Sequence, residues 1–202
     1  MIAIVDYGVG NLFSLRCSLN AIGEDAVVTS DKEILHNADR IILPGVGAFA
    51  DAARKLRESG LDVVVKDEAA RGKKLLGICL GMQMLFEESL ENGIYEGLGL
   101  IPGSVRPIAE VIPDSMKIPH IGWNKLILKG NSPLYNHVEN DGHVYFVHSY
   151  HAVTDDKYIL AKTEYGALLT ASVSKGNVYG CQFHPEKSGE TGLNILKGFC
   201  AL

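Results

Sequence analysis

The stretch Lys74-Leu75-Leu76-Gly77-Ile78-Cys79-Leu80-Gly81-Met82-Gln83 decides the fold of this chain. Residues 75–78 form a short apolar run, which is typical of a buried strand, and we predict a strand over residues 74–78. Leu80, Met84 and Leu85 predict a helix that begins directly after Cys79 and ends near Gly93. The pattern Gly-x-Cys-x-Gly between the two predicts a sharp strand-to-helix bend, the thiol counterpart of the Gly-x-Ser-x-Gly elbow.

Short apolar runs and helical patterns alternate on the amino-terminal side of this bend. The predicted strands are Ile2–Val5, Ala26–Thr29 and Arg40–Leu43, and the predicted helices cover residues 12–22, 49–60 and 61–71. Strands that alternate with helices of this length favour a parallel sheet covered by helices on both faces.

The second half of the chain has a different pattern. Four apolar runs, Val144–Val147, Ile159–Thr163, Ala167–Val173 and Asn177–Phe183, follow one another with short turns and predict antiparallel or mixed strands added to the sheet. A last amphipathic helix carries Leu193, Leu196 and Phe199. We therefore expect one α/β domain over residues 1–202, with three layers and a mostly parallel central sheet.

Composition excludes several function classes. The chain has 202 residues, with 19 Lys and Arg against 24 Asp and Glu, so its formal net charge is −5. This charge does not favour binding to nucleic acid or to an anionic membrane. No stretch has the roughly 18 apolar residues of a membrane span, and the four cysteines contain no Cys-x-x-Cys pair. These features predict a soluble, cytoplasmic protein.

Cys79 is the candidate nucleophile. The elbow would present its sulfur above the carboxyl end of the sheet, where open α/β folds bind ligands. Only a few per cent of an ordinary thiol is the reactive thiolate at neutral pH, and the start of a helix stabilises negative charge. The backbone N–H of Leu80 would point at a developing oxyanion, so Cys79 is placed for acyl-transfer chemistry.

The segment Gly180-Cys181-Gln182-Phe183-His184-Pro185-Glu186 supplies a partner for this thiol. In a strand, Gln182 and His184 share one face and Cys181 and Phe183 the other. Pro185 restricts the backbone of His184, and Glu186 is close enough to accept a ring N–H. Cys, His and acid in this order match the triads of hydrolases built on elbows.

Three further patterns bear on which kind of site the chain contains. Pro44-Gly45-Val46-Gly47 follows a predicted strand, and its peptide N–H groups are candidate oxyanion donors. Gly8 and Gly10 do not complete the dinucleotide-binding pattern Gly-x-Gly-x-x-Gly, because Phe13 stands where the pattern needs its third glycine. His143, His148 and His151 lack the cysteine or carboxylate that would complete a zinc spacing, so we expect no metal.

Several of these segments together resemble a known family. Gly77-Ile-Cys-Leu-Gly-Met-Gln83, Pro44-Gly-Val-Gly47 and His184-Pro-Glu186 are similar to the motifs of class I, triad-type glutamine amidotransferases. Four segments indicate a particular branch of this family: Ile4-Val-Asp-Tyr-Gly-Val-Gly-Asn-Leu12, Pro44-Gly-Val-Gly-Ala-Phe49, Ile118-Pro-His-Ile-Gly-Trp-Asn124 and Tyr145-Phe-Val-His-Ser-Tyr150. These segments resemble the glutaminase subunits of imidazole glycerol phosphate synthases.

The resemblance implies roles for individual residues. Cys79 would attack the side-chain amide of L-glutamine, His184 would carry the proton and Glu186 would orient it. The oxyanion hole would be formed by Leu80 and the turn of Gly45, Val46 and Gly47, and glutamine would be held by Gln83, Glu91, Ser149 and Tyr150.

The resemblance also implies a partner and no cofactor. Ammonia would pass to a cyclase subunit with a (β/α)8 barrel, in a heterodimer whose interface includes Trp123 and Lys187. A glutaminase subunit of another synthase, such as the pyridoxal phosphate synthase, remains the alternative.

Overall fold

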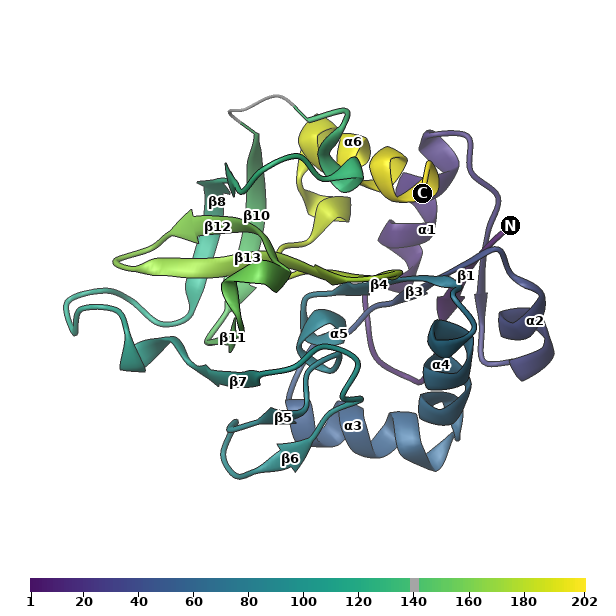
Figure 1. Ribbon diagram of the computed structural model, residues 1–202, viewed down its shortest axis with the longest axis horizontal. Helices are drawn as coiled ribbons and strands as arrows, with labels where there is room; N and C mark the ends of the chain where they lie inside the picture. Colours follow the sequence, from purple (N-terminus) through teal and green to yellow (C-terminus); the bar gives the residue numbers. More distant parts are fainter. Residues whose placement is uncertain (139–141) are drawn as a thin grey trace.

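A central eight-stranded sheet organises the computed structural model, which describes residues 1–138 and 142–202. Its strands lie in the order β2-β1-β3-β4-β14-β13-β12-β9, and the first five of them are parallel (Figure 1). The last three are antiparallel. Their bounds are β1 (Ile2–Val5), β2 (Ala26–Thr29), β3 (Arg40–Leu43), β4 (Lys74–Ile78), β9 (Ile127–Leu128), β12 (Ile159–Glu164), β13 (Leu168–Lys175) and β14 (Val178–Cys181).

Helices cover both faces of this sheet. In Figure 1, α1 (Leu12–Ala21) and α6 (Gly189–Cys200) lie above it, whereas α3 (Phe49–Glu58), α4 (Leu61–Ala70) and α5 (Leu80–Gln83) lie below it. The short α2 (Lys32–Asn37) packs with the second group through Leu35. The result is a three-layer α/β fold with one hydrophobic core on each face of the sheet, as the sequence predicts.

The four predicted strands of the parallel half agree with the structure to the residue. All four residues of β1 are buried, because helices cover both of its faces. Strand β14 lies parallel beside β4, with Gly180 opposite Gly77 and Cys181 opposite Ile78. This pairing joins segments about a hundred residues apart and brings the ends of the two strands to one edge.

The helix predicted from Leu80 to near Gly93 is wrong, because α5 ends at Gln83. A longer helix would need the carbonyl groups of Met84, Leu85 and Phe86 for its own hydrogen bonds. In the structure these carbonyls accept from the backbone N–H groups of residues 98–101 instead. The chain after α5 therefore forms a compact loop with two short strands, β5 (Glu88–Ser89) and β6 (Tyr95–Glu96).

The predicted strand Val144–Val147 also differs, because it does not join the central sheet. It is part of β10 (His143–His148), which pairs with β8 (His120–Lys125) in a separate two-stranded sheet. The place beside β4 is taken by β14. A third sheet has the order β11-β7-β5-β6, with β7 at Ser104–Pro107 and β11 at Tyr150–Val153.

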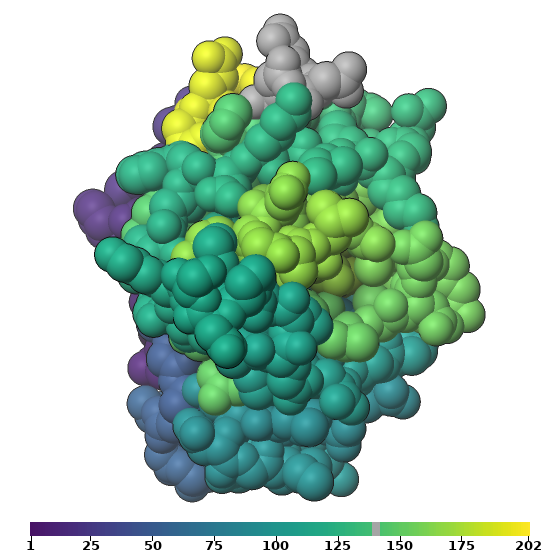
Figure 2. Space-filling view, turned by 90° about the vertical axis from the view of Figure 1, so that its left-hand side faces the viewer, coloured from purple at the N-terminus to yellow at the C-terminus, as the bar shows by residue number. Residues whose placement is uncertain are grey.

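Short 3₁₀ helices complete the elements. They are η1 (Ile108–Glu110), η2 (Pro133–Tyr135), η3 (Asp156–Tyr158) and η4 (Pro185–Lys187). The loop after β7 packs against the β12–β13 hairpin through Ile108, Ile112 and Leu169. Figure 2 shows these segments side by side, the loop in teal and the hairpin in yellow-green.

Across residues 1–138 and 142–202, every helix is too short or too polar to cross a membrane.

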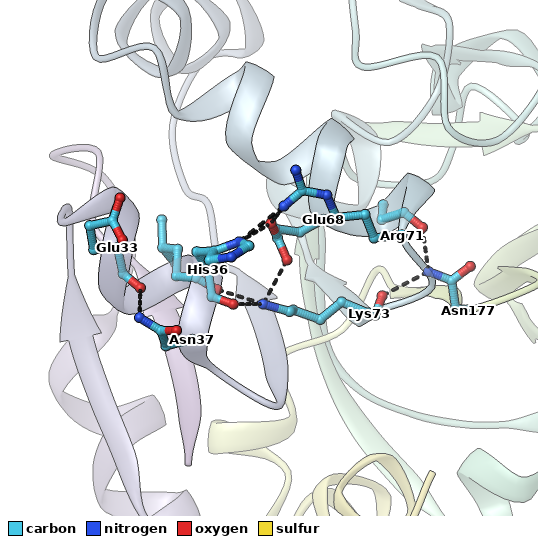
Figure 3. A network of polar contacts seen from close by, with 9 residues as sticks. Glu33, His36, Asn37, Glu68, Arg71, Lys73 and Asn177 are labelled. Carbon is cyan, nitrogen blue, oxygen red and sulfur yellow. Dashed lines mark hydrogen bonds and ion pairs between the residues drawn. The ribbon is translucent and has the colours of Figure 1, made fainter.

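An ion-pair network joins the elements at the amino-terminal end of β4. Glu68 of α4 is only 5% exposed and contacts Lys73 at 2.7 Å, His36 at 2.8 Å and Arg71 at 2.9 Å (Figure 3). The Lys73 ammonium also donates to the backbone carbonyls of Leu35 and His36. The network therefore fastens α2 to α4 at the end of the sheet opposite Cys79.

Replacing Glu68 by Gln is expected to destabilise the fold, because it leaves the Lys73 ammonium, whose side chain is only 12% exposed, without its counter-charge. Breaking such a pair costs about 3 kcal/mol of unfolding free energy, which urea denaturation at pH 7 would measure. Glu58→Gln is the matched control, since the Glu58 carboxylate pairs with Arg54 on the exposed surface and should change stability by less than about 1 kcal/mol.

The same variant has a predicted pH dependence. Burial raises the pKa of Glu68, but Lys73 and His36 outweigh it and lower the pKa to about 2. Since the folded pKa lies below the unfolded one, the stabilisation is full above about pH 4.5 and is lost as the pH falls towards 2. The stability difference between wild type and Glu68→Gln should therefore shrink over this range, and a constant difference would contradict the assignment.

Candidate active site

The candidate site lies where three parallel strands end. Strands β3, β4 and β14 point the same way, so the turns that follow them, at Pro44, Cys79 and Gln182, meet at one edge of the sheet. A cavity of about 310 Å³ opens there. It is lined by Val46, Gly47, Cys79, Leu80, Gln83, Glu91, Pro119, Val147, His148, Ser149, Tyr150 and His184.

Cys79 occupies a strained bend. Its φ of 55° and ψ of −112° are rare for a residue with a side chain. The bend is possible because its flanking glycines let backbones approach closely: a Cβ on Gly81 would lie 1.9 Å from the carbonyl oxygen of Leu43, and one on Gly77 would lie 2.7 Å from the carbonyl oxygen of Gly81. The structure thus has the elbow geometry, with a largely buried thiol beside the cavity.

His184, which lines the cavity, forms a buried pair with Glu186. The Nδ1 atom of His184 lies 2.8 Å from Oε1 of Glu186, and both side chains are 3% exposed. The other ring nitrogen, Nε2, makes no hydrogen bond to any residue that the structure describes. Burial lowers the pKa of His184, but Cys79 and Glu186 outweigh it and raise the pKa to about 10. Cys79 and His184 both line the cavity.

The turn after β3 approaches the elbow. Gly47 has a φ of 91°, which suits glycine, and Val46 is partly exposed at the cavity wall. Gly45 lies behind the wall, where an added Cβ would come within 2.8 Å of the Gly81 nitrogen and the Tyr7 hydroxyl. That hydroxyl donates to the Pro44 carbonyl at 2.7 Å. Tyr7 was not among the predicted site residues, although it holds this turn in place.

The four residues predicted to hold glutamine, Gln83, Glu91, Ser149 and Tyr150, all line the cavity. The Gln83 amide nitrogen donates to the Tyr150 carbonyl at 3.2 Å. The Glu91 carboxylate accepts from the backbone N–H of Phe49 at 2.9 Å, which fixes it beside the start of α3. The cavity therefore has a carboxylate that can pair with an ammonium group.

Two further groups belong to the site, of which sequence reasoning missed the first. Gln182 is fully buried and its amide nitrogen lies 3.7 Å from the Cys79 sulfur; its sharing of a strand face with His184 could have indicated it. His148 lines the cavity and hydrogen-bonds through Nδ1 to the Tyr150 carbonyl at 2.8 Å. Burial lowers the pKa of His148 to about 3, so its ring is neutral.

Trp123 and Lys187 lie outside the cavity. Trp123, on β8, is 62% exposed and its ring centre is 4.8 Å from that of Tyr145. The Lys187 ammonium lies 5.6 Å from the same Tyr145 ring. We call these three residues the aromatic patch. Tyr145 is bridged through its backbone to His184, so the patch lies directly beside the catalytic candidates.

The three histidines weighed as metal ligands lie on β10 and β11. Within residues 1–138 and 142–202, no group of three or more His, Cys, Asp and Glu side chains is arranged to hold a metal ion.

Comparison with known proteins shows to which class of proteins the chain belongs. The family model for glutamine amidotransferase class-I matches residues 3–201. Solved structures with the same fold include PurLQS from Thermotoga maritima, with a TM-score of 0.75 at 24% identity, covering 99% of this chain and 97% of that one. A structure described as a glutamine amidotransferase gives a TM-score of 0.76 at 21% identity, covering 99% and 100%. The chain belongs to the class I glutamine amidotransferases.

More similar sequences narrow this class to a branch. An imidazole glycerol phosphate synthase subunit HisH from Geobacillus sp. (strain WCH70) is 51% identical, with 100% of this chain and 97% of that protein covered. The protein of the same name from Caldanaerobacter subterraneus subsp. tengcongensis is 50% identical over 98% and 97%. Within its class, the chain belongs to the HisH family.

Proposed function

We propose that this protein is the glutaminase subunit of an imidazole glycerol phosphate synthase and that residues 1–202 work as one amidotransferase domain. It hydrolyses L-glutamine to glutamate and ammonia, and it passes the ammonia to a cyclase subunit. That subunit makes imidazole glycerol phosphate and aminoimidazole carboxamide ribonucleotide in histidine biosynthesis. The observation that carries the proposal is the elbow thiol of Cys79 in one cavity with His184, whose ring is paired with the buried carboxylate of Glu186.

The first half of the reaction forms a thioester. The Cys79 sulfur attacks the side-chain amide carbon of glutamine, and the C–N bond breaks as His184 gives its proton to the departing nitrogen. The raised pKa of His184, about 10, means that the imidazole holds this proton at neutral pH. Glu186 orients the ring through Nδ1, which leaves Nε2 for the transfer.

The second half regenerates the thiolate. Water loses a proton to His184 and attacks the thioester carbon, and the C–S bond breaks to release glutamate. In both halves the developing oxyanion is stabilised by the backbone N–H of Leu80 and by the turn of Gly45, Val46 and Gly47. Glu91 binds the ammonium group of the substrate, while Gln83 and the backbone of Ser149 and Tyr150 complete the pocket.

The aromatic patch is the proposed docking site for the cyclase, a (β/α)8 barrel. Trp123 and the neighbouring Ile121 are 62% and 57% exposed on β8, and large exposed apolar side chains of this kind are typical of interfaces. The backbone of Tyr145 pairs with that of His184, which supports a docking site close to the proposed proton donor. The cytoplasmic location stays a prediction.

Trapping the thioester tests the proposal. Isotope-labelled glutamine is added, the reaction is stopped with acid, and peptides are analysed by mass spectrometry. We expect a γ-glutamyl group on Cys79 and none on Cys17, the exposed cysteine of α1, which serves as the internal control. Consumption of glutamine without any adduct on Cys79, under conditions that preserve a model thioester, would argue against the mechanism.

A further inference from the structure

We propose that Gln182 is a further catalytic residue, whose side-chain N–H donates a hydrogen bond to the Cys79 sulfur and stabilises its thiolate. Gln83 fixes which end of the Gln182 amide faces the sulfur. This inference deepens the proposed function and rests on Cys79 being the nucleophile.

The contacts of Gln182 carry the first step. It follows β14 directly and is fully buried. Its Nε2 atom lies 3.7 Å from the Cys79 sulfur, within hydrogen-bond range for sulfur, and its Oε1 accepts from the Gln83 amide nitrogen at 3.0 Å. Both ends of a buried amide thus have partners, as the cost of desolvating a polar group requires.

The direction of the hydrogen bonds carries the second step. A backbone carbonyl can only accept, so the end of the Gln83 side chain that faces the Tyr150 carbonyl must be its NH₂ group. The same NH₂ group faces Gln182, so the Gln182 oxygen must lie on that side. The NH₂ group of Gln182 is then left for the sulfur. The amide orientation therefore follows from a backbone atom.

The anchor of this chain is itself held. The Tyr150 carbonyl also interacts with Nδ1 of His148 at 2.8 Å. Because His148 is neutral and this contact requires a hydrogen on Nδ1, its Nε2 is an acceptor, and Nδ1 of His120 lies 2.9 Å from it. Two donors thus converge on the Tyr150 oxygen. Reversing the Gln83 amide group would place its oxygen against the Tyr150 oxygen.

A donor aimed at this sulfur has a chemical consequence. A thiolate accepts stronger hydrogen bonds than a neutral thiol does, because the acceptor is charged. The Gln182 N–H therefore raises the fraction of Cys79 that can attack the substrate. The same donor stabilises the thiolate that leaves when water cleaves the thioester. Its contribution adds to that of His184.

Alkylation of Cys79 measures the thiolate directly. The wild type and Gln182→Met, which keeps a similar size without a donor, are treated with iodoacetamide between pH 5 and 10. The alkylated Cys79 and Cys17 peptides are quantified by mass spectrometry. We expect the Cys79 rate profile of the variant to move by about one pH unit to higher pH, while the Cys17 profile stays unchanged.

A second variant sharpens the test. Gln182→Glu keeps the acceptor for Gln83 but places a carboxylate by the sulfur, so its Cys79 profile should move further than that of Gln182→Met. In both variants kcat/KM for glutamine should fall most at the acid end of the range, about tenfold for Gln182→Met and more for Gln182→Glu, and recover as the pH rises. The KM should change little, because Gln182 does not line the cavity.

The outcomes separate the two proposals. Unchanged alkylation profiles in both folded variants would overturn the role of Gln182, whereas glutaminase activity that survives Cys79→Ala would overturn the proposed function. If the variants do not fold, the wild type provides the measurement. The ¹⁵N side-chain resonance of Gln182 should then move over the pH range in which Cys79 becomes reactive, and no movement there would overturn the inference.

Discussion

Cys79→Ala should abolish glutamine-dependent synthesis in the complex with a cyclase subunit, while synthesis from added ammonium salts continues. Removing the nucleophile of a triad costs about 10⁴-fold or more in rate, which places the residual activity near background. The substitution is clean, because alanine keeps a Cβ at the φ of 55° and so bears a backbone strain similar to that of cysteine. Both activities would be measured by the rate of product formation.

The two ammonia sources distinguish chemistry from assembly. If Cys79 supplies only the thiol, added ammonium salts bypass it and the complex still forms. Loss of both activities would instead mean that Cys79 supports the fold or the interface. Cys17→Ala is the matched control, since that cysteine is exposed on α1, and both of its activities should equal those of the wild type.

Gly81→Ala should have the second largest effect, through the geometry of the elbow. The added Cβ would lie 1.9 Å from the Leu43 carbonyl oxygen and 2.8 Å from its carbon, and both atoms belong to the backbone of β3. Either α5 or the end of β3 must move. We expect a loss of about 3 kcal/mol or more in unfolding free energy and at least a hundredfold loss of glutaminase activity.

Gly176→Ala is the control for this prediction. Gly176 lies between β13 and β14 with a φ of 62°, and a Cβ there would meet nothing within 4 Å. It should cost only the left-handed backbone strain of about 1 kcal/mol and leave activity intact. Urea denaturation gives the stability, and the rate of glutamate formation from glutamine gives the glutaminase activity. A Gly81→Ala protein as stable and active as the wild type would contradict the close-approach argument.

The agreement between sequence and structure is greatest where local pattern and burial coincide. Strands β1 and β4 lie between two helical layers, so their burial appears in the sequence as continuous apolar runs. The bend at Cys79 was also readable, because glycine two residues before and after it marks a position where backbones touch. The His184–Glu186 pair was readable for a similar reason, because Pro185 and Glu186 follow His184 directly in the sequence.

The differences arise where distant segments compete with local preference. Residues after Gln83 have a helical pattern, but their carbonyls accept from residues 98–101. The strand at Val144–Val147 was correct in type, yet its partner β8 could not be deduced from its own alternation. The helix α2 was missed, although Asp31 caps it by accepting from Glu33 and Ile34.

Four strands of the parallel half of the sheet, the elbow at Cys79 and the His184–Glu186 pair could be predicted from the sequence, because each depends on residues within one short segment. The position of β14 beside β4, the contact by which Tyr7 holds the turn after β3 and the contact of Gln182 with the sulfur could not be predicted. The last two are hydrogen bonds between residues that are 37 and 103 positions apart. They exist only once β1, β3, β4 and β14 lie side by side, so no local pattern can encode them.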